Sequence, residues 1–303
     1  MRISKYHGTG NDFVVVEDLD GRLDLPPAFV AAVCDRHRGV GGDGLIRIVR
    51  GGARGGDEAD FFMDYVNADG HPAEMCGNGI RCLAAYVYDR DLTSKTELEV
   101  DTRDGVKRLT LDVAGSRVRS VTVDMGVPAL ERALIPMTGG DPSERVVGEP
   151  LDAAGRTWTV SAVSMGNPHC VVFLDAAEDL AATDVPGVGR AIETLPVFPN
   201  RTNVEFVKVP DHSHVDMRVW ERGVGETLAC GTGACAALVA SAVAGRTGRA
   251  AEVTVPGGRL EVDWQGDDRV YLTGPATFVF DADLSEDWAR AAGLSGIPTA
   301  AAS

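Results

Sequence analysis

The stretch Cys76-Gly77-Asn78-Gly79 recurs with one change as Cys230-Gly231-Thr232-Gly233, 154 residues further along the chain. A strand-like segment precedes each copy. An apolar segment follows each copy, and its pattern predicts buried helices over residues 80–89 and 234–244. Each cysteine is therefore expected at the opening of a central helix.

A second pair of matching segments supports a duplication. Gly10-Asn11-Asp12-Phe13 corresponds to Gly166-Asn167-Pro168-His169 at a spacing of 156 residues, in the same order as the cysteine motifs. Two collinear matches at nearly constant spacing predict a pseudo-symmetric pair of half-chains joined near residues 118–132. The alternative is one irregular β-rich domain with coincidental turns.

The composition describes an acidic globular protein. Its 29 basic and 45 acidic side chains give a net charge of −16, which disfavours nucleic acid and anionic membranes as partners. The 44% of hydrophobic residues can form a sizeable core. The start of the chain lacks the apolar run of a signal peptide, and no window is long enough to span a membrane. We expect a cytoplasmic protein whose six cysteines are thiols.

A cysteine at the first turn of a helix has chemistry that a buried cysteine lacks. Unpaired N–H groups and the helix dipole stabilise the thiolate there. Glycines that follow let a small anion such as a carboxylate approach the same amides. Two such thiols, on opposite faces of one carbon, could remove a proton and return another with inversion.

Other uses of the cysteines find less support. Free cysteine is usually inert packing, and we assign that role to Cys34, Cys82, Cys170 and Cys235. The spacing of a zinc site or of a thioredoxin-like pair is absent from the sequence, as are nucleotide-binding glycine motifs and any motif for pyridoxal phosphate. We therefore expect neither a metal nor a cofactor.

At these motifs the chain resembles the diaminopimelate epimerase family, whose members act without a cofactor in lysine and peptidoglycan-precursor synthesis. The motifs run in family order over nearly the whole chain. The segments that carry the resemblance are 5–13, Asn67, 74–81, 166–169, 203–206, 221–222, 229–234 and 272–276.

The resemblance implies an α/β (α+β) fold of two pseudo-symmetric domains. Each would be a sheet wrapped around a central helix, with the active site in the cleft between them. We expect residues 1–119 with 275–303 to carry Cys76, and residues 120–274 to carry Cys230. The resemblance also implies a homodimer that binds diaminopimelate.

The resemblance further implies a set of site residues. Cys76 and Cys230 would be the opposed acid and base that convert L,L- to meso-diaminopimelate. His169 and Glu221 would modulate the pKa of the two thiols. The residues expected to bind substrate are Asn11, Asn67, Gly77, Asn78, Asn167, Asn203, Glu221, Arg222, Gly231 and Thr232.

Several alternatives remain open at this level. An asparagine such as Asn11 is often a turn residue, the pair Glu221-Arg222 could be an exposed ion pair, and His169 could be a core histidine. The cysteine motif alone would also suit a proline or hydroxyproline racemase, or a non-catalytic amino-acid-binding thiol sensor. One position departs from the family pattern, because Gly44 stands where many relatives carry glutamine.

Overall fold

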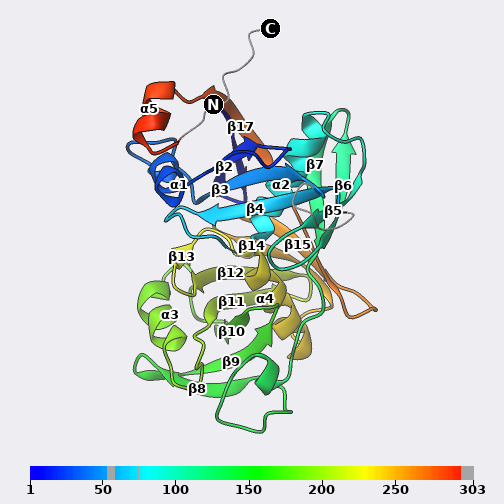
Figure 1. Cartoon of the computed structure of the whole chain (residues 1–303). Coiled ribbons are helices and arrows are strands. Elements are labelled where there is room, and N and C mark those ends of the chain that lie inside the picture. Colours follow the sequence, from blue (N-terminus) through cyan, green and yellow to red (C-terminus); the bar gives the residue numbers. More distant parts are fainter. Residues whose placement is uncertain (53–58, 74, 295–303) are drawn as a thin grey trace. The chain divides into compact units, whose positions relative to one another are not determined.

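A computed structural model describes residues 1–52, 59–73 and 75–294 of the chain (Figure 1). Glu74, part of the first cysteine motif, lies outside the described residues. The chain divides into two compact units, which are Met1–Val123 with Pro275–Ser303 (unit 1) and Asp124–Gly274 (unit 2). Both units mix strands and helices, so the predicted α/β class is confirmed. Over the described residues, every helix is too short or too polar to cross a membrane.

Unit 1 is a curved sheet of eight strands in the order β17-β1-β2-β3-β4-β5-β6-β7. Only the β2–β3 and β4–β5 pairs are parallel, and the helices α1 and α2 supply the crossovers that parallel pairs require. The elements are β1 (Arg2–Gly8), β2 (Asn11–Glu17), α1 (Pro27–Cys34), β3 (Gly44–Arg50), β4 (Phe61–Asn67), α2 (Gly77–Asp89), β5 (Glu97–Asp101), β6 (Lys107–Ala114), β7 (Arg117–Asp124), β17 (Thr277–Asp283) and α5 (Glu286–Ala291).

Unit 2 is a sheet in the order β8-β9-β10-β11-β12-β14-β15-β16, with the short β13 paired to β12. Its parallel pairs are β10–β11 and β12–β14, joined through α3 and α4. The elements are η1 (Arg132–Leu134), β8 (Glu149–Ala153), β9 (Arg156–Ser164), β10 (Pro168–Phe173), α3 (Val185–Glu193), β11 (Asn203–Asp211), β12 (His214–Glu221), β13 (Gly225–Thr227), α4 (Gly231–Val243), β14 (Ala250–Val255), β15 (Gly258–Trp264) and β16 (Val270–Gly274).

The two sheets have the same sequence of parallel and antiparallel pairs. Read from β17 in unit 1 and from β8 in unit 2, the third and fourth strands pair in parallel, as do the fifth and sixth, and all other neighbours are antiparallel. By this order β2 corresponds to β10, β3 to β11, and helix α2 to helix α4.

Each cysteine motif opens the helix around which its own sheet curls. Helix α2 packs against β1, β2, β3, β4, β6 and β17 of unit 1, and α4 packs against β9, β10, β11, β12, β14, β15 and β16 of unit 2 (Figure 1). Every residue of α2 from Gly77 to Val87 is buried, and so is most of α4 as far as Ser241. The predicted burial of both helices is therefore confirmed. Each begins three residues earlier than its apolar pattern predicts, because the glycines of the motif form its first turn.

Alternate residues of the central strands face opposite sides of each sheet. In β11 the side chains of Val204 and Phe206 join the apolar core that also contains Val188 and Ile192 of α3. The residue between them, Glu205, therefore points to the other face, where α4 lies. A fully buried carboxyl group is thus directed at the central helix.

Candidate active site

Cys76 and Cys230 occupy the same position in their two helices. Each is the N-cap residue in extended backbone, with φ and ψ of −139° and 114° for Cys76 and −128° and 117° for Cys230. Each sulfur accepts a hydrogen bond at 3.4 Å from the third residue of its helix, Gly79 or Gly233. Both thiols thus take the place of an ordinary N-cap oxygen, where the helix dipole favours a negative charge.

The second glycine of each motif, which is the third residue of its helix, makes room for the protein's own side chains. A Cβ atom at Gly79 would lie 3.1 Å from Cδ1 of Ile46 and 3.4 Å from Cβ of Cys76. A Cβ atom at Gly233 would lie 2.8 Å from Oε1 of Glu205 and 3.3 Å from the sulfur of Cys230. These two glycines therefore permit tight packing behind each thiol.

In unit 1 the thiol lies beside a pair of asparagines. Cys76 Sγ is 3.6 Å from Oδ1 of Asn11, and Asn78 Nδ2 donates to the same oxygen at 3.3 Å. The Nδ2 group of Asn11 donates to Asp43 at 2.6 Å. Because the carboxylate can only accept, it fixes the amide of Asn11 with its carbonyl toward Cys76.

A buried arginine holds the first turn of α2. The guanidinium of Arg81 is fully enclosed, and it donates to the side-chain oxygen of Asn78 at 2.8 Å and to the carbonyl of Gly77 at 3.0 Å. The hydroxyl of Thr9 donates to the same oxygen of Asn78 at 3.3 Å. A positive charge is therefore built into the helix that Cys76 caps.

In unit 2 a chain of polar groups leads away from Cys230. The sulfur lies 3.5 Å from the hydroxyl of Thr232, which accepts from Nδ2 of Asn167 at 3.4 Å. Oδ1 of Asn167 is 2.9 Å from Nε2 of His169, and Nδ1 of His169 is 2.7 Å from Oε1 of Glu205. Four of the predicted site residues therefore meet in one network, together with the carboxyl group of Glu205, for which the sequence predicted no role.

The surroundings of Cys230 oppose its ionisation. Burial raises the pKa of the thiol well above its ordinary value, and the carboxyl groups of Glu221 and Glu205 raise it further. Hydrogen bonds from Thr232 and Gly233 act in the other direction without balancing these effects. Cys230 is consequently a thiol at neutral pH, which is the form of a proton donor.

Glu221, Asn203 and Arg222 lie together where β11 and β12 pair. Burial raises the pKa of Glu221, whose carboxylate accepts from the hydroxyl of Thr227. The side chain of Asn203 donates to the carbonyl of Pro168 at 3.0 Å and accepts from the backbone N–H of Arg222 at 2.9 Å. Asn203 thus holds the backbone around Arg222, whose own side chain is exposed.

Gly44 lies opposite Asn67 in the β3–β4 ladder, and the packing explains why it carries no side chain. A Cβ atom there would lie 2.5 Å from the ring of Tyr65 and 2.6 Å from the carbonyl oxygen of Val66. The tyrosine ring fills the space that a glutamine would need. Asn67 is the last residue of β4, and its backbone N–H donates to the carbonyl of His71 at 2.9 Å.

The other four cysteines are enclosed in the two cores. Cys34, Cys82, Cys170 and Cys235 are all buried, and all six cysteines of the chain are free thiols. Burial raises the pKa of Cys34 to about 11 and that of Cys82 to about 12, and it also raises the pKa of Cys170. None of the four caps the start of a helix as Cys76 and Cys230 do, so they remain assigned to packing.

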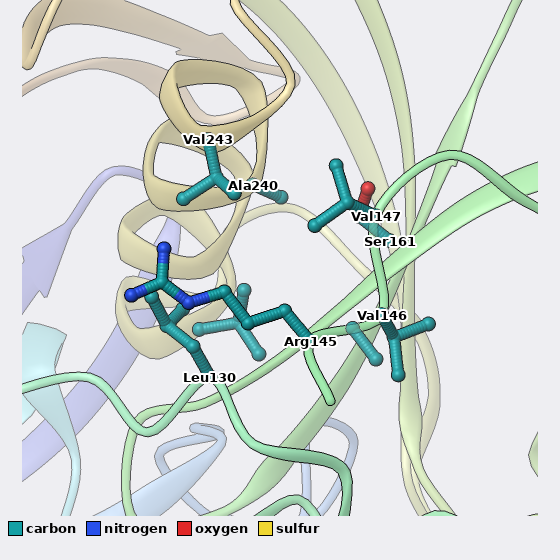
Figure 2. A pocket seen from close by; sticks show the side chains of 9 residues that line it. Leu130, Arg145, Val146, Val147, Ser161, Ala240 and Val243 are labelled. Atoms are coloured by element: carbon teal, nitrogen blue, oxygen red, sulfur yellow. The ribbon is translucent and has the colours of Figure 1, made fainter. Parts of the chain in front are cut away.

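A small pocket in unit 2 is separate from these groups (Figure 2). It lies beside the C-terminal half of α4, at Ala240 and Val243, whereas Cys230 caps the other end of that helix. Its walls are mainly apolar, and Arg145 extends across it toward the helix. The pocket is therefore not part of the candidate site.

Three buried or half-buried residues near the thiols were not predicted. They are Glu205, Asp43 and Arg81. Each forms a hydrogen bond to a predicted site residue, which is His169, Asn11 and Asn78 in turn. One of them had a visible signal, since Glu205 interrupts the apolar run 204–207 of a predicted buried strand. Asp43 lies in a turn and Arg81 ends the segment 74–81, and nothing in the sequence marks the partners of either.

Solved structures of known proteins show the class of fold. A hydroxyproline epimerase from Agrobacterium vitis superposes with a TM-score of 0.66 at 14% identity, covering 96% of this chain and 98% of that one. A phenazine biosynthesis protein from Bacillus anthracis gives 0.65 at 17% identity, covering 94% and 99%. At these identities the likeness establishes the fold alone, which is the mixed α/β fold of these proteins.

Sequence comparison then identifies the family. The sequence model of the diaminopimelate epimerase family matches residues 3–131 and 161–279 of this chain. A diaminopimelate epimerase from Desulfitobacterium hafniense is 48% identical over 291 residues, covering 95% of this chain and 99% of the relative. Another from Desulforudis audaxviator is 50% identical over 293 residues, covering 96% and 100%. The chain belongs to the diaminopimelate epimerase family.

Proposed function

We propose that this protein interconverts L,L- and meso-diaminopimelate by proton transfer between two cysteines. One observation carries the proposal. Cys76 and Cys230 cap equivalent helices with the same geometry, and each sulfur accepts a hydrogen bond at 3.4 Å from the backbone N–H of the third helix residue. Inversion of one carbon needs a base on one face and an acid on the other, and a duplicated thiol supplies both. Membership of the family supports the choice of substrate.

In the proposed reaction a thiolate removes the proton from the carbon beside a carboxylate. The electron pair of the broken C–H bond moves into that carboxylate, and the opposite thiol then gives its proton to the other face of the carbon. The charge that develops on the carboxylate is stabilised by the first-turn amides of the helices. In the reverse direction the two thiols exchange roles. Because the pKa of Cys230 is raised, we assign it the role of acid in the resting protein.

The remaining site residues divide by position. His169 and Glu221 are proposed to modulate the thiols, and the amides of Gly77, Asn78, Gly231 and Thr232 to hold the reacting carboxylate. The distal amino-acid group of the substrate carries both charges, so it needs donors and acceptors together. For this end we propose Asn11, Asn67, Asn167, Asn203, Glu221 and Arg222.

Several properties of the whole protein belong to the same proposal. We infer that residues 1–119 with 275–303 and residues 120–274 are duplicated halves, each with a central helix, and that substrate binds in the cleft between them. The common pairing pattern of the two sheets supports the duplication. We further propose a cytoplasmic homodimer that uses neither metal nor cofactor; light scattering of the purified protein tests the dimer.

A substrate panel tests the proposed function. Purified protein with reduced thiols would be incubated in deuterium oxide with L,L-diaminopimelate, L-proline or trans-4-hydroxy-L-proline, and deuterium at the α-carbon would be measured by mass spectrometry. We expect exchange with diaminopimelate alone. Exchange with the proline compounds instead would assign the protein to the racemase alternative, and binding of diaminopimelate without exchange would indicate the thiol sensor.

A further inference from the structure

The two central helices have unlike groups behind their thiols. In the parallel ladders Phe13 pairs with Gly44 in unit 1, and His169 pairs with Asn203 in unit 2. Two residues further along the fourth strands of the two sheets stand Ile46 and Glu205.

The glycine contacts give the same correspondence independently. Ile46 is the nearest neighbour of a Cβ atom at Gly79, and Glu205 is the nearest neighbour of one at Gly233. The histidine and carboxyl group behind Cys230 therefore replace a phenylalanine and an isoleucine behind Cys76.

The hydrogen-bond partners of His169 determine how many protons the site holds. Asn167 donates its NH₂ group to Thr232, so its carbonyl oxygen faces Nε2 of His169. An amide oxygen only accepts, so Nε2 carries a hydrogen. At Nδ1, 2.7 Å from Glu205, one further hydrogen lies on either the ring or the carboxyl group. With these donor and acceptor roles, the histidine and carboxyl group together would hold two protons and carry no net charge.

The second oxygen of Glu205 agrees with this count. Oε2 is buried, and among the described residues it has no hydrogen-bond donor. Both side chains of the pair are fully enclosed. A buried charged carboxylate with an unsatisfied oxygen is costly, whereas a carboxyl group that shares a proton with His169 avoids most of that cost.

We propose that Glu205 is a positioning residue for Cys230. By sharing a proton with His169, it keeps that histidine in the tautomer with hydrogen on Nε2. This hydrogen orients the amide of Asn167, which in turn directs the hydroxyl of Thr232 toward the sulfur. Each step follows from donor and acceptor roles. Nε2–H fixes the amide of Asn167, the amide fills an acceptor site on Thr232, and the hydroxyl hydrogen is left to point at Cys230, 3.5 Å away. The orientation is the one that stabilises the thiolate that Cys230 becomes once it has given up its proton.

The effect on proton transfer by Cys230 rests on the proposed function, whereas the assignment of the hydrogen to Nε2 of His169 does not. If Glu205 were ionised and His169 neutral with its hydrogen on Nδ1, Nε2 would be bare, and the amide of Asn167 would have to turn over to donate to it. The hydroxyl of Thr232 would then donate to Asn167 and would accept from a Cys230 thiol. The two arrangements differ at a single observable atom, Nε2 of His169.

Nitrogen NMR of the full chain, without substrate, tests the proposal directly. The chain has six histidines, and comparison with His169→Gln assigns the signals of His169. We expect Nε2 of His169 to be protonated near neutral pH in the wild type and in Glu205→Gln, whose amide can donate to a bare Nδ1. In Glu205→Ile, which places the residue of unit 1 behind Cys230, the tautomer should no longer be fixed. A bare Nε2 in the wild type would overturn the proposal.

Turnover of diaminopimelate gives the second readout. Glu205→Gln should keep kcat within about threefold. Glu205→Ile should lower kcat about 10-fold to 100-fold with little change in KM, which is the size of effect seen in metalloproteins when a group that orients a metal-bound histidine is removed. Equal losses of kcat in both variants would contradict the positioning role. Both variants remove the carboxyl group, but only Glu205→Ile leaves Nδ1 of His169 without a hydrogen-bond donor. If the wild type turns over nothing, the proposed function fails, and the NMR result still decides the role of Glu205.

A control separates positioning from general stability. Glu149→Gln removes a carboxyl group that pairs with the buried Arg132 in the same unit. It should lower Tm while leaving kcat and the His169 signals as in the wild type. If Glu205→Ile behaves like this control, with a changed Tm but normal kcat and His169 signals, Glu205 is only structural and the proposal is wrong.

Discussion

The backbone of Gly233 packs directly against the carboxyl group of Glu205, so that a Cβ atom on the glycine would lie 2.8 Å from Oε1. The same oxygen is held at 2.7 Å by His169. The space that a side chain at Gly233 would need is therefore filled by the carboxyl group that supports His169, so the protein itself requires this glycine, as well as any ligand.

This contact predicts unequal effects of one substitution in the two motifs. Gly233→Ala should cost about 1–3 kcal/mol, the range for overpacking, because the carboxyl group it meets is held in place by His169. Gly79→Ala should be roughly neutral, because Cδ1 of Ile46, 3.1 Å away, is the end of a flexible side chain. Urea unfolding of the two variants measures the difference, and equal losses would show that Glu205 is not held in place.

Gly44 gives a second steric prediction. Gly44→Gln introduces the residue that the family resemblance led us to expect, but it should destabilise the protein by about 2 kcal/mol or more, because the ring of Tyr65 and a backbone carbonyl occupy the space. The exposed Gly266 has open space around it, so Gly266→Gln should leave Tm unchanged. A stable Gly44→Gln variant with a lower KM would contradict this packing argument.

Asp43 is predicted to matter through Asn11. Asp43→Ala removes the acceptor that fixes the amide of Asn11 beside Cys76, and loss of one charge-assisted hydrogen bond should lower kcat/KM about 10-fold. Asp60→Ala removes a surface partner of Lys95 and serves as the control, with unchanged kcat/KM. Steady-state kinetics of both variants decide, and similar small effects would remove Asp43 from the site.

Buried thiols predict a loss of stability at high pH. The native protein keeps the proton of Cys82 up to a pKa of about 12, whereas the unfolded chain releases it near pH 9, so stability falls as pH rises between these values. Each such group contributes a slope of about 1.4 kcal/mol per pH unit.

Chemical denaturation at several alkaline pH values measures that slope. Cys82→Ala should flatten it, while Leu83→Ala, which removes a fully buried side chain without a titrating group, should lower stability equally at all pH values. An unchanged slope in Cys82→Ala would mean that Cys82 titrates at its ordinary pKa.

The sequence predicted the elements whose signals are local. The two central helices, their burial and the cysteines at their openings follow from short motifs and apolar runs. The apolar pattern predicts both helices to begin three residues later than they do, because glycine has low helix propensity and cysteine is an unusual N-cap. Strand β3 (Gly44–Arg50) has only a weak local signal, since it begins in a run of glycines and contains two arginines.

The contacts that complete the candidate site could not be predicted in this way. His169 and Glu205 are 36 residues apart and meet only because β10 and β11 pair in parallel in one particular register. Asp43 and Asn11 are likewise 32 residues apart in the sequence, with helix α1 between them. Such pairs depend on strand order and register, which the apolar pattern of a single chain does not determine.

The most direct test of the two-thiol account is the fate of the α-hydrogen in single cysteine variants. Wild type, Cys76→Ala and Cys230→Ala would each be given L,L-diaminopimelate in deuterium oxide, with all thiols reduced, and the meso product and its deuterium content measured. We predict that the wild type forms meso product with one deuterium at the inverted carbon, and that both variants lose net epimerisation by a factor of at least about 10². Inversion at near wild-type rate by either variant would contradict the account, because one thiol would then serve both faces.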